Sequence, residues 1–235
     1  MVQPSIYGTD NSRMLDAMAM FGEMARGVAV VAEDVGRAEI QRLHAAGIRG
    51  LRVNIELVKP VDSKELARRM IHLARRTRDM DWHLQLYIGS HFLEALVPTV
   101  EQLPVDVVFD HMARIPANEV PGHPGLGAVQ RMLRTGRCWI KVSGAYRVSR
   151  KEGHYEEVAR LARALVEAYP DRMVWGSDWP HTPPHAYEPA PDGTIMPFRR
   201  LDTGQLLDLL ADWVPDDHVR NRILVQNPAR LYGFD

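Results

Sequence analysis

The chain has 235 residues, of which 46% are hydrophobic and 25% charged, with 29 Lys and Arg against 30 Asp and Glu. This is the composition of an ordinary globular protein, and the net charge of −1 argues against nucleic-acid binding by neutralisation of phosphates. The single cysteine, Cys138, excludes an intramolecular disulfide and a zinc site built from cysteines, and no apolar run approaches the ~20 residues of a membrane span.

Short apolar segments alternate with amphipathic segments along the chain. The chain opens with Val2–Ser5, which we expect to be a strand, followed by a turn at Gly8 and a helix near Asn11–Phe21. Six further strands are predicted, several of them apolar enough to be buried on both faces: Val28–Val31, Gly50–Ile55, His83–Ile88, Val105–Asp110, Cys138–Ser143 and Met173–Ser177. Helices are predicted at Arg37–Ala46, Ser63–Thr77, Phe92–Val100, Gly127–Arg134 and Tyr155–Ala168, and at the end near Thr203–Trp213 and Asp217–Val225.

The helix at Ser63–Thr77 has the clearest pattern, because its apolar residues share one face and its arginines the other; these apolar residues are Leu66, Met70, Leu73 and Ala74. Gly47 follows the preceding helix at the position of a typical C-terminal cap. The segment His181–Arg200 contains five prolines and is therefore predicted to be a long loop.

Repeated strand–helix–strand spacing indicates a parallel α/β sheet in a single domain over residues 1–235. Such a sheet either closes at eight strands, as a (β/α)8 barrel, or stays open and doubly wound. With seven predicted strands, the chain is one unit short of the barrel.

Functional groups of both architectures lie at the C-terminal ends of the strands. Polar residues within or directly after the predicted strands include Arg52, Tyr87, His111, Arg147, Asp178 and His181. His111 is also compatible with a structural role and Asp178 with capping of a turn, whereas Arg52 lies inside an apolar run and needs an anionic partner. The nucleophile elbow, the Walker loop, the dinucleotide fingerprint and the H-E-x-x-H motif are all absent from the sequence.

The segments at these strand ends resemble a known family. QPSIYGTDN, GIRGLRVN, WHLQLYI, VVFDHMAR, WIKVSGAYR, WGSDWPH and NPARLYGF follow one another as in the amidohydrolase-related (β/α)8 hydrolases, and most closely as in the branch that contains 2-pyrone-4,6-dicarboxylate lactonase. The pair FDHM and WGSDWPH is the most specific part of the resemblance, which extends over essentially the whole chain.

The resemblance implies a site with a His-x-His pair on the first strand, a His on a middle strand and an Asp on the last. His111 and Asp178 match the latter two. These groups hold a divalent metal in many relatives, zinc or manganese, whereas the lactonase branch works without metal. In that branch the substrate contacts match Ser5, Arg52, Tyr87, His111 and Arg147, and we add His181 as a neighbouring candidate.

The sequence departs from the family pattern at three places, of which the smallest is Ala113, where a glycine is usual. The His-x-His strand is absent, so we expect either that the natural protein starts upstream of Met1 or that a partner strand fills the gap. Glu56 and Lys59 stand where the family carries a second substrate arginine, so the resemblance does not fix a dicarboxylate as the substrate.

The first hypothesis is therefore a hydrolase that opens the lactone of an anionic small molecule with water activated by Asp178. The second is a metal-dependent amidohydrolase or decarboxylase in which His111 and Asp178 bind the metal. The third is a non-catalytic truncated barrel that works only in an oligomer. No signal peptide is visible, which predicts a cytoplasmic protein; nucleic-acid and membrane partners are not expected, and a homo-oligomer remains open.

Overall fold

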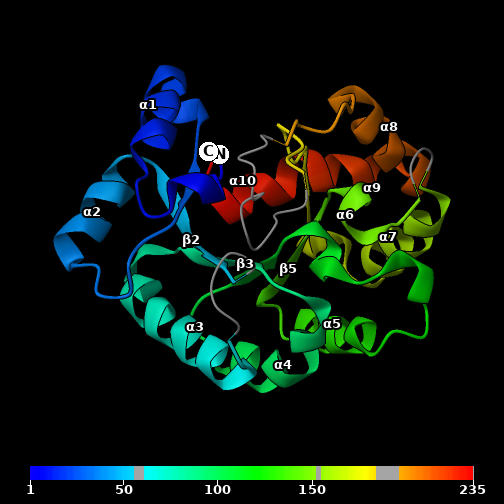
Figure 1. Ribbon diagram of the computed structural model, residues 1–235, viewed down its shortest axis with the longest axis horizontal. Coiled ribbons are helices and arrows are strands. Elements are labelled where there is room, and N and C mark those ends of the chain that lie inside the picture. Colours follow the sequence, from blue (N-terminus) through cyan, green and yellow to red (C-terminus); the bar gives the residue numbers. More distant parts are fainter. Residues whose placement is uncertain (56–60, 152–154, 184–195, 235) are drawn as a thin grey trace.

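The computed structural model of the protein describes residues 1–55, 61–151, 155–183 and 196–234. Its centre is a parallel sheet whose strands lie side by side in chain order (Figure 1). The strands are β1 (Gly27–Ala29), β2 (Ile48–Asn54), β3 (His83–Tyr87), β4 (Val107–Phe109), β5 (Cys138–Ser143) and β6 (Met173–Gly176). The prediction of a parallel α/β sheet is confirmed.

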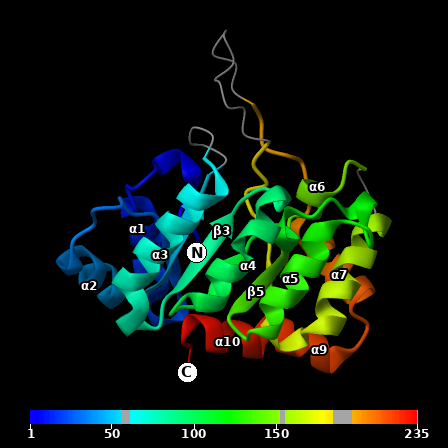
Figure 2. The ribbon, with the colours of Figure 1, turned by 90° about the horizontal axis from the view of Figure 1, so that it is seen from below.

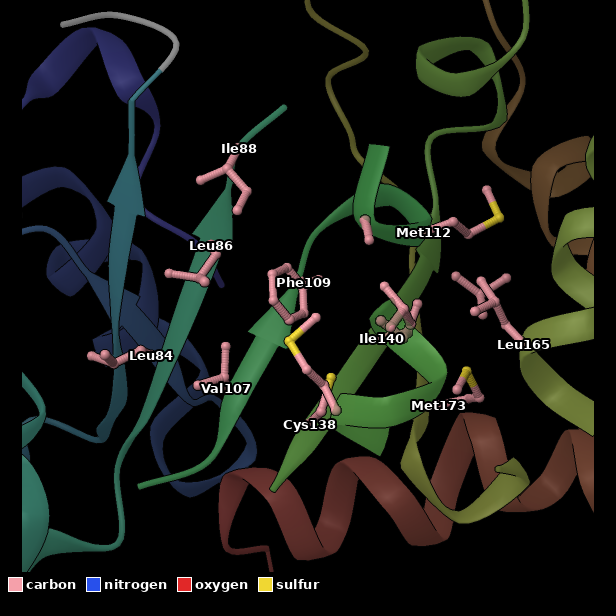
Figure 3. Close-up of a cluster of buried hydrophobic side chains, with 14 of the residues drawn as sticks. Leu84, Leu86, Ile88, Val107, Phe109, Met112, Cys138, Ile140, Leu165 and Met173 are labelled. Atoms are coloured by element: carbon pink, nitrogen blue, oxygen red, sulfur yellow. The ribbon is translucent and has the colours of Figure 1, made fainter. Parts of the chain in front are cut away.

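Helices connect the strands and pack beside the sheet. They are α1 (Ser12–Phe21), α2 (Arg37–Ala45), α3 (Ser63–Thr77), α4 (Leu93–Gln102), α5 (Pro124–Arg134), α6 (Ala145–Val148), α7 (Glu156–Ala168), α8 (Thr203–Trp213), α9 (Asp217–Asn221) and α10 (Asn227–Tyr232). Figure 2 shows α4 and α5 side by side along the sheet, and Figure 3 shows the C-terminal helical segment below the starts of the strands. No helix in the described part of the chain is both long and apolar enough to cross a membrane.

One face of the sheet supplies the main hydrophobic core. Successive strand side chains point to opposite faces, and every second residue of β3 and β4 enters this core. Figure 3 shows Leu84 and Leu86 of β3 beside Val107 and Phe109 of β4, all of them buried. The same core takes Leu66, Met70, Leu73 and Ala74 of α3, which confirms the predicted apolar face of that helix.

The opposite face of the sheet is polar where the sequence predicted apolar strands. Arg52, Gln85 and Lys141 alternate with core residues on β2, β3 and β5, and hydrogen bonds and ion pairs connect each of them to Asp110. The prediction that several strands are buried on both faces is confirmed for β3, β4 and β5, but part of the second buried face is polar rather than apolar. Nearer the strand starts, this face carries a small apolar cluster, in which Val108 and Trp139 meet Leu231 of α10.

The structure differs from the prediction at the first strand and at the last helix of the chain. Val2–Ser5 is not a full strand: Val2 forms a single parallel bridge to Val28, and Ser5–Tyr7 turns into a short 3-10 helix. Pro4 has no amide hydrogen to donate, which limits the ladder there. At the other end, the helix predicted to stop at Val225 continues through a π-helical segment, Arg222–Gln226, into α10.

Most other boundaries agree with the prediction within a few residues. Gly47 has φ of 91°, as its capping position requires. The described parts of the proline-rich loop, residues 181–183 and 196–200, contain no helix or strand, as predicted.

His83, at the start of β3, gives the fold a testable pH dependence. Its ring is buried, packs against Tyr232, and fills the space over Gly50, where a Cβ would lie 2.6 Å from Nε2. Burial, with the nearby positive charge of Lys141, lowers the pKa of His83 to about 3. The folded state therefore keeps His83 neutral, while the unfolded chain takes up a proton below pH ~6.5.

The unfolded state binds more protons in this range, so the free energy of unfolding falls as the pH drops from about 6.5 towards 3. We expect the native protein to lose about 2 kcal/mol more between pH 7 and pH 5 than the His83→Gln variant. Urea unfolding at both pH values measures this difference, with His218→Gln, at an exposed position, as the control. Equal losses in the native protein and in His83→Gln would contradict the assignment.

Candidate active site

The C-terminal ends of five neighbouring strands bring the predicted site residues to one edge of the sheet. Arg52 lies in β2 and Tyr87 ends β3. His111 comes two residues after β4, and Asp178 comes two residues after β6. Parallel strands all end at the same edge, which is why residues far apart in sequence converge there.

His111 and Asp178 form the centre of the site. His111 Nε2 lies 3.8 Å from Asp178 Oδ1, and His111 Nδ1 makes a 2.9 Å hydrogen bond with Ser143 Oγ at the end of β5. His111 is buried, and burial lowers its pKa to about 4 despite the attraction of Asp110 and Asp178. The imidazole is therefore neutral near pH 7, with its Nε2 directed at the carboxylate.

The second oxygen of Asp178 is held by neighbours from α6. Tyr146 donates its hydroxyl hydrogen to Oδ2 at 2.6 Å, and Arg147 Nε donates to the same oxygen. Burial raises the pKa of Asp178, but the interaction with His111, the charge of Arg147 and these two hydrogen bonds together lower it below its ordinary value. Asp178 is thus an ionised carboxylate with Oδ2 engaged by Tyr146 and Arg147 and Oδ1 turned towards His111.

The backbone at the site is strained. His111, Met112, Ala113 and Arg114 have φ between 50° and 55°, and Asp178 has φ of 56°. The left-handed region costs L-residues roughly 1–2 kcal/mol each. Strained residues of this kind cluster at functional sites, where the surrounding fold holds them in place.

Arg147 and His181, predicted to contact the substrate, are occupied by protein groups. Arg147 Nε bonds Asp178, and its Nη2 donates to Thr182 Oγ1 at 2.9 Å. His181 is buried, with Nδ1 3.3 Å from the Tyr146 hydroxyl and Nε2 3.0 Å from Thr203 Oγ1. Both side chains therefore serve first to hold Asp178 and Tyr146 in position; their contact with a substrate stays a prediction.

Ser5, Arg52 and Tyr87 lie together as predicted. Arg52 Nη1 donates to Ser5 Oγ at 2.9 Å, and Asn54 Nδ2 donates to the same hydroxyl oxygen at 2.8 Å. The guanidinium carbon of Arg52 lies 5.4 Å from the centre of the Tyr87 ring, and that of Arg147 lies 5.9 Å from it. The ring of Tyr87 also packs edge-on against His111, which joins this group to the Asp178 centre.

A buried charge network lies beneath these groups on the polar face of the sheet. Asp110 Oδ1 accepts from Lys141 Nζ at 2.8 Å, and its Oδ2 accepts from Gln85 Nε2 at 3.1 Å. Arg52 Nε lies 3.7 Å from the same Oδ2. Burial raises the pKa of Asp110, but the positive charges of Lys141 and Arg52 and the interaction with His111 lower it overall, so the carboxylate stays ionised.

Sequence reasoning missed several members of this arrangement as site residues. Tyr146 and Ser143 lie at or just after a predicted strand end, but nothing in their spacing showed that they hold Asp178 and His111. Lys141 lies in the middle of a strand of otherwise mostly apolar residues. A charged residue inside an apolar run is the signal that singled out Arg52, and it would have identified Lys141 as well.

The described residues supply two of the ligands that a metal would need. No group of three or more His, Cys, Asp or Glu side chains in the described ranges could hold a metal ion. A catalytic zinc usually has three protein ligands, and here the Arg147 guanidinium contacts Oδ2 of Asp178, which opposes a cation at that oxygen. The described donor set alone therefore does not fit a catalytic metal. Glu56 and Lys59, which depart from the family pattern, lie outside the described residues.

A separate cleft of about 270 Å³ lies at the opposite end of the strands. It is lined by residues from the strand starts and from α10, among them Trp82, Trp139 and Arg230. It contains none of the predicted site residues, so the functional interpretation rests on the edge that carries His111 and Asp178.

Comparison with known proteins supports the resemblance seen in the sequence. A 2-pyrone-4,6-dicarbaxylate hydrolase of Comamonas testosteroni is 34% identical over 242 residues, which cover 98% of this chain and 74% of that protein. A 4-sulfomuconolactone hydrolase of Hydrogenophaga intermedia is 31% identical over 233 residues, covering 99% of this chain and 73% of that protein.

The solved structures give the same result. A putative 2-pyrone-4,6-dicarboxylic acid hydrolase from Pseudomonas putida superposes with a TM-score of 0.83 at 27% identity, covering 100% of this chain and 81% of the other. A model of the family described as amidohydrolase matches residues 1–234. The predicted resemblance is confirmed, and the chain belongs to the amidohydrolase family.

Proposed function

We propose that the protein hydrolyses the lactone of an anionic small molecule. The observation that carries this proposal is the pair formed by His111 and Asp178, whose Nε2 and Oδ1 atoms are 3.8 Å apart beside Arg52 and Tyr87. The similar proteins support it, since they are named as hydrolases of a sulfomuconolactone and of a pyrone dicarboxylate, and one as a D-galactarolactone isomerase.

Asp178 acts as the general base in this proposal. Its Oδ1 takes a proton from water as the water oxygen attacks the lactone carbonyl carbon. His111 stabilises the negative charge that develops on the carbonyl oxygen. When the ring C–O bond breaks, the proton on Asp178 passes to the leaving oxygen, which becomes a hydroxyl group, and Asp178 is ionised again. The new carboxylic acid then releases its own proton to solvent and leaves as a carboxylate.

The arginines of the site select an anionic substrate. Tyr87 and the guanidinium group of Arg52 orient a substrate carboxylate, which an arginine binds in a directional way. Arg147 contributes to substrate binding only through Nη1, because its Nε is bonded to Asp178 and its Nη2 to Thr182. Ser5 Oγ accepts hydrogen bonds from Arg52 and Asn54, so Ser5 positions these two side chains as well as lying near the substrate.

We further propose that the sheet is an arc of a (β/α)8 barrel. The Val2 bridge and β6 form the two edges of the described sheet. One further strand between these edges, in addition to the six strands and the Val2 segment, brings the number to eight.

A panel of lactones tests the proposed function. We expect the purified protein to open lactones of sugar acids or of aromatic breakdown products that carry a carboxylate, and to leave the uncharged analogues almost untouched. The rate is measured by acid release at constant pH. A folded protein that turns over no lactone on the panel would support the non-catalytic alternative and overturn the proposal.

Metal analysis decides between the metal-free and metal-dependent alternatives. An amidohydrolase from Burkholderia multivorans that shares this fold at 15% identity, with a TM-score of 0.64, was solved with bound zinc. For this protein we expect hydrolysis to persist after chelation. Stoichiometric zinc or manganese, together with activity that is lost on chelation and restored by the metal, would favour the metal-dependent enzyme instead.

A further inference from the structure

We infer that Lys141 and Asp110, buried beneath the site, set its charge so that Arg52 remains free to bind an anion. The inference rests on the proposed function and names residues that govern its substrate class. Lys141 and Asp110 do not touch the substrate in this scheme; they are positioning residues that act through Arg52.

The charges of this network do not cancel. Arg52 and Lys141 each carry a positive charge and Asp110 a negative one, which leaves a net charge of +1 on side chains that are 11%, 10% and 3% exposed. Gln85, the fourth member, is neutral and buried. A net charge removed from water is costly unless an opposite charge lies nearby. The network therefore favours an anion at the strand ends above it.

The hydrogen bonds show which cation neutralises Asp110. Lys141 Nζ occupies Oδ1 at 2.8 Å and Gln85 Nε2 occupies Oδ2 at 3.1 Å. Arg52 Nε remains 3.7 Å from Oδ2 and has no hydrogen-bond partner among the described residues. Lys141 thus takes the hydrogen bond to the carboxylate, while Arg52 lies near it without one, so the two cations share a single negative charge and a net charge of +1 remains.

The Nη1 end of the Arg52 guanidinium group is held by residues near the start of the chain. Its Nη1 donates to Ser5 Oγ at 2.9 Å and to the main-chain oxygen of Gln3 at 3.3 Å, both neutral acceptors. These bonds orient the guanidinium group without cancelling its charge. If Lys141 lost its charge, Arg52 would be drawn to Asp110, and the pair would become neutral.

Four variants separate the charge of this network from its packing. Lys141→Met removes one positive charge and leaves a net charge of zero, whereas Asp110→Asn raises the net charge to +2. The double variant Asp110→Asn/Lys141→Met returns the net charge to +1 with Arg52 as its only source. Lys64→Met removes an exposed lysine from α3 and is the matched control.

The probe is isophthalate, a planar dicarboxylate without a lactone bond, and calorimetry measures its dissociation constant. We expect Lys141→Met to weaken binding about tenfold, Asp110→Asn to strengthen it, and Lys64→Met to leave it unchanged. The double variant should bind within about threefold of the native protein. Circular dichroism and thermal unfolding verify that each variant is folded, and if either single variant does not fold, the double variant alone decides.

Native affinity in Lys141→Met would overturn the inference. A double variant that binds as weakly as Lys141→Met would overturn it too, since the effect of the lysine would then be one of packing alone. Absence of isophthalate binding to the native protein would also overturn it. If the variants show the expected binding pattern but the protein opens no lactone, the proposed function is overturned and the inference about the charge network stands. With a lactone substrate, Lys141→Met should raise KM about tenfold with a much smaller change in kcat.

Discussion

Replacement of Asp178 by Asn is expected to lower kcat/KM for lactone hydrolysis by about 10³-fold or more. The amide keeps the size of the side chain and an oxygen that accepts from Tyr146 and Arg147, but it cannot take a proton from water. Because Oδ2 of Asp178 already accepts from these two neighbours, Oδ1 is the position at which the proton is taken up. Initial rates on the best lactone of the panel measure the loss.

The control for this variant is Asp208→Asn, which makes the same chemical change at an exposed position of α8. It should retain the native kcat/KM. Hydrolysis at a near-native rate by Asp178→Asn would show that another group activates the water, and the assignment of the base would then be wrong.

Replacement of Gly144 by Ala is expected to reduce kcat/KM at least about 100-fold, because it displaces His111. Gly144 has φ of 56°, and a Cβ at this position would lie 2.7 Å from His111 Nδ1. It would also lie 3.3 Å from Asp178 Oδ2. The new methyl group therefore separates His111 from Ser143 and disturbs the catalytic carboxylate, in addition to a backbone cost of about 1–2 kcal/mol.

Gly233→Ala separates these two effects. Gly233 is also left-handed, with φ of 63° and ψ of 56°, but the nearest described atom to a Cβ there would be Arg49 Nε at 3.8 Å, an ordinary contact. Both variants should lose stability in urea unfolding, Gly144→Ala the more because of its added contacts, while only Gly144→Ala loses activity. Native activity in Gly144→Ala would contradict the arrangement of His111 described above.

Much of the fold could be predicted from the periodicity of the sequence. The apolar face of α3 and the strands β2, β3 and β5 are clear because burial against a single core imposes regular spacing on the side chains. The Val2 segment was over-predicted, since an apolar residue followed by Pro4 supports only one bridge. The last helices were predicted too short, because a π-helical segment leaves no distinct spacing in the sequence.

The site could be predicted only in part. His111 and Asp178 follow strands directly, and the topology of a parallel sheet brings such positions together. Whether the Arg147 side chain contacts a substrate or Asp178 depends on its position to within a few ångströms. It also depends on which hydrogen-bond acceptors, here Asp178 and Thr182, lie within its reach. Its contact with Asp178 and the position of Tyr146 therefore became visible only in the folded chain.

The sequence by itself determined the parallel α/β arrangement, the family and the residues at the strand ends, because these follow from side-chain periodicity and from motifs that are local in the chain. The tertiary structure alone decided how the charges are paired: Asp110 hydrogen-bonds Lys141, Asp178 hydrogen-bonds Arg147, and Arg52 lies near Asp110 without a hydrogen bond to it. Pairing across neighbouring strands depends on register and on side-chain direction, and a linear sequence carries neither explicitly.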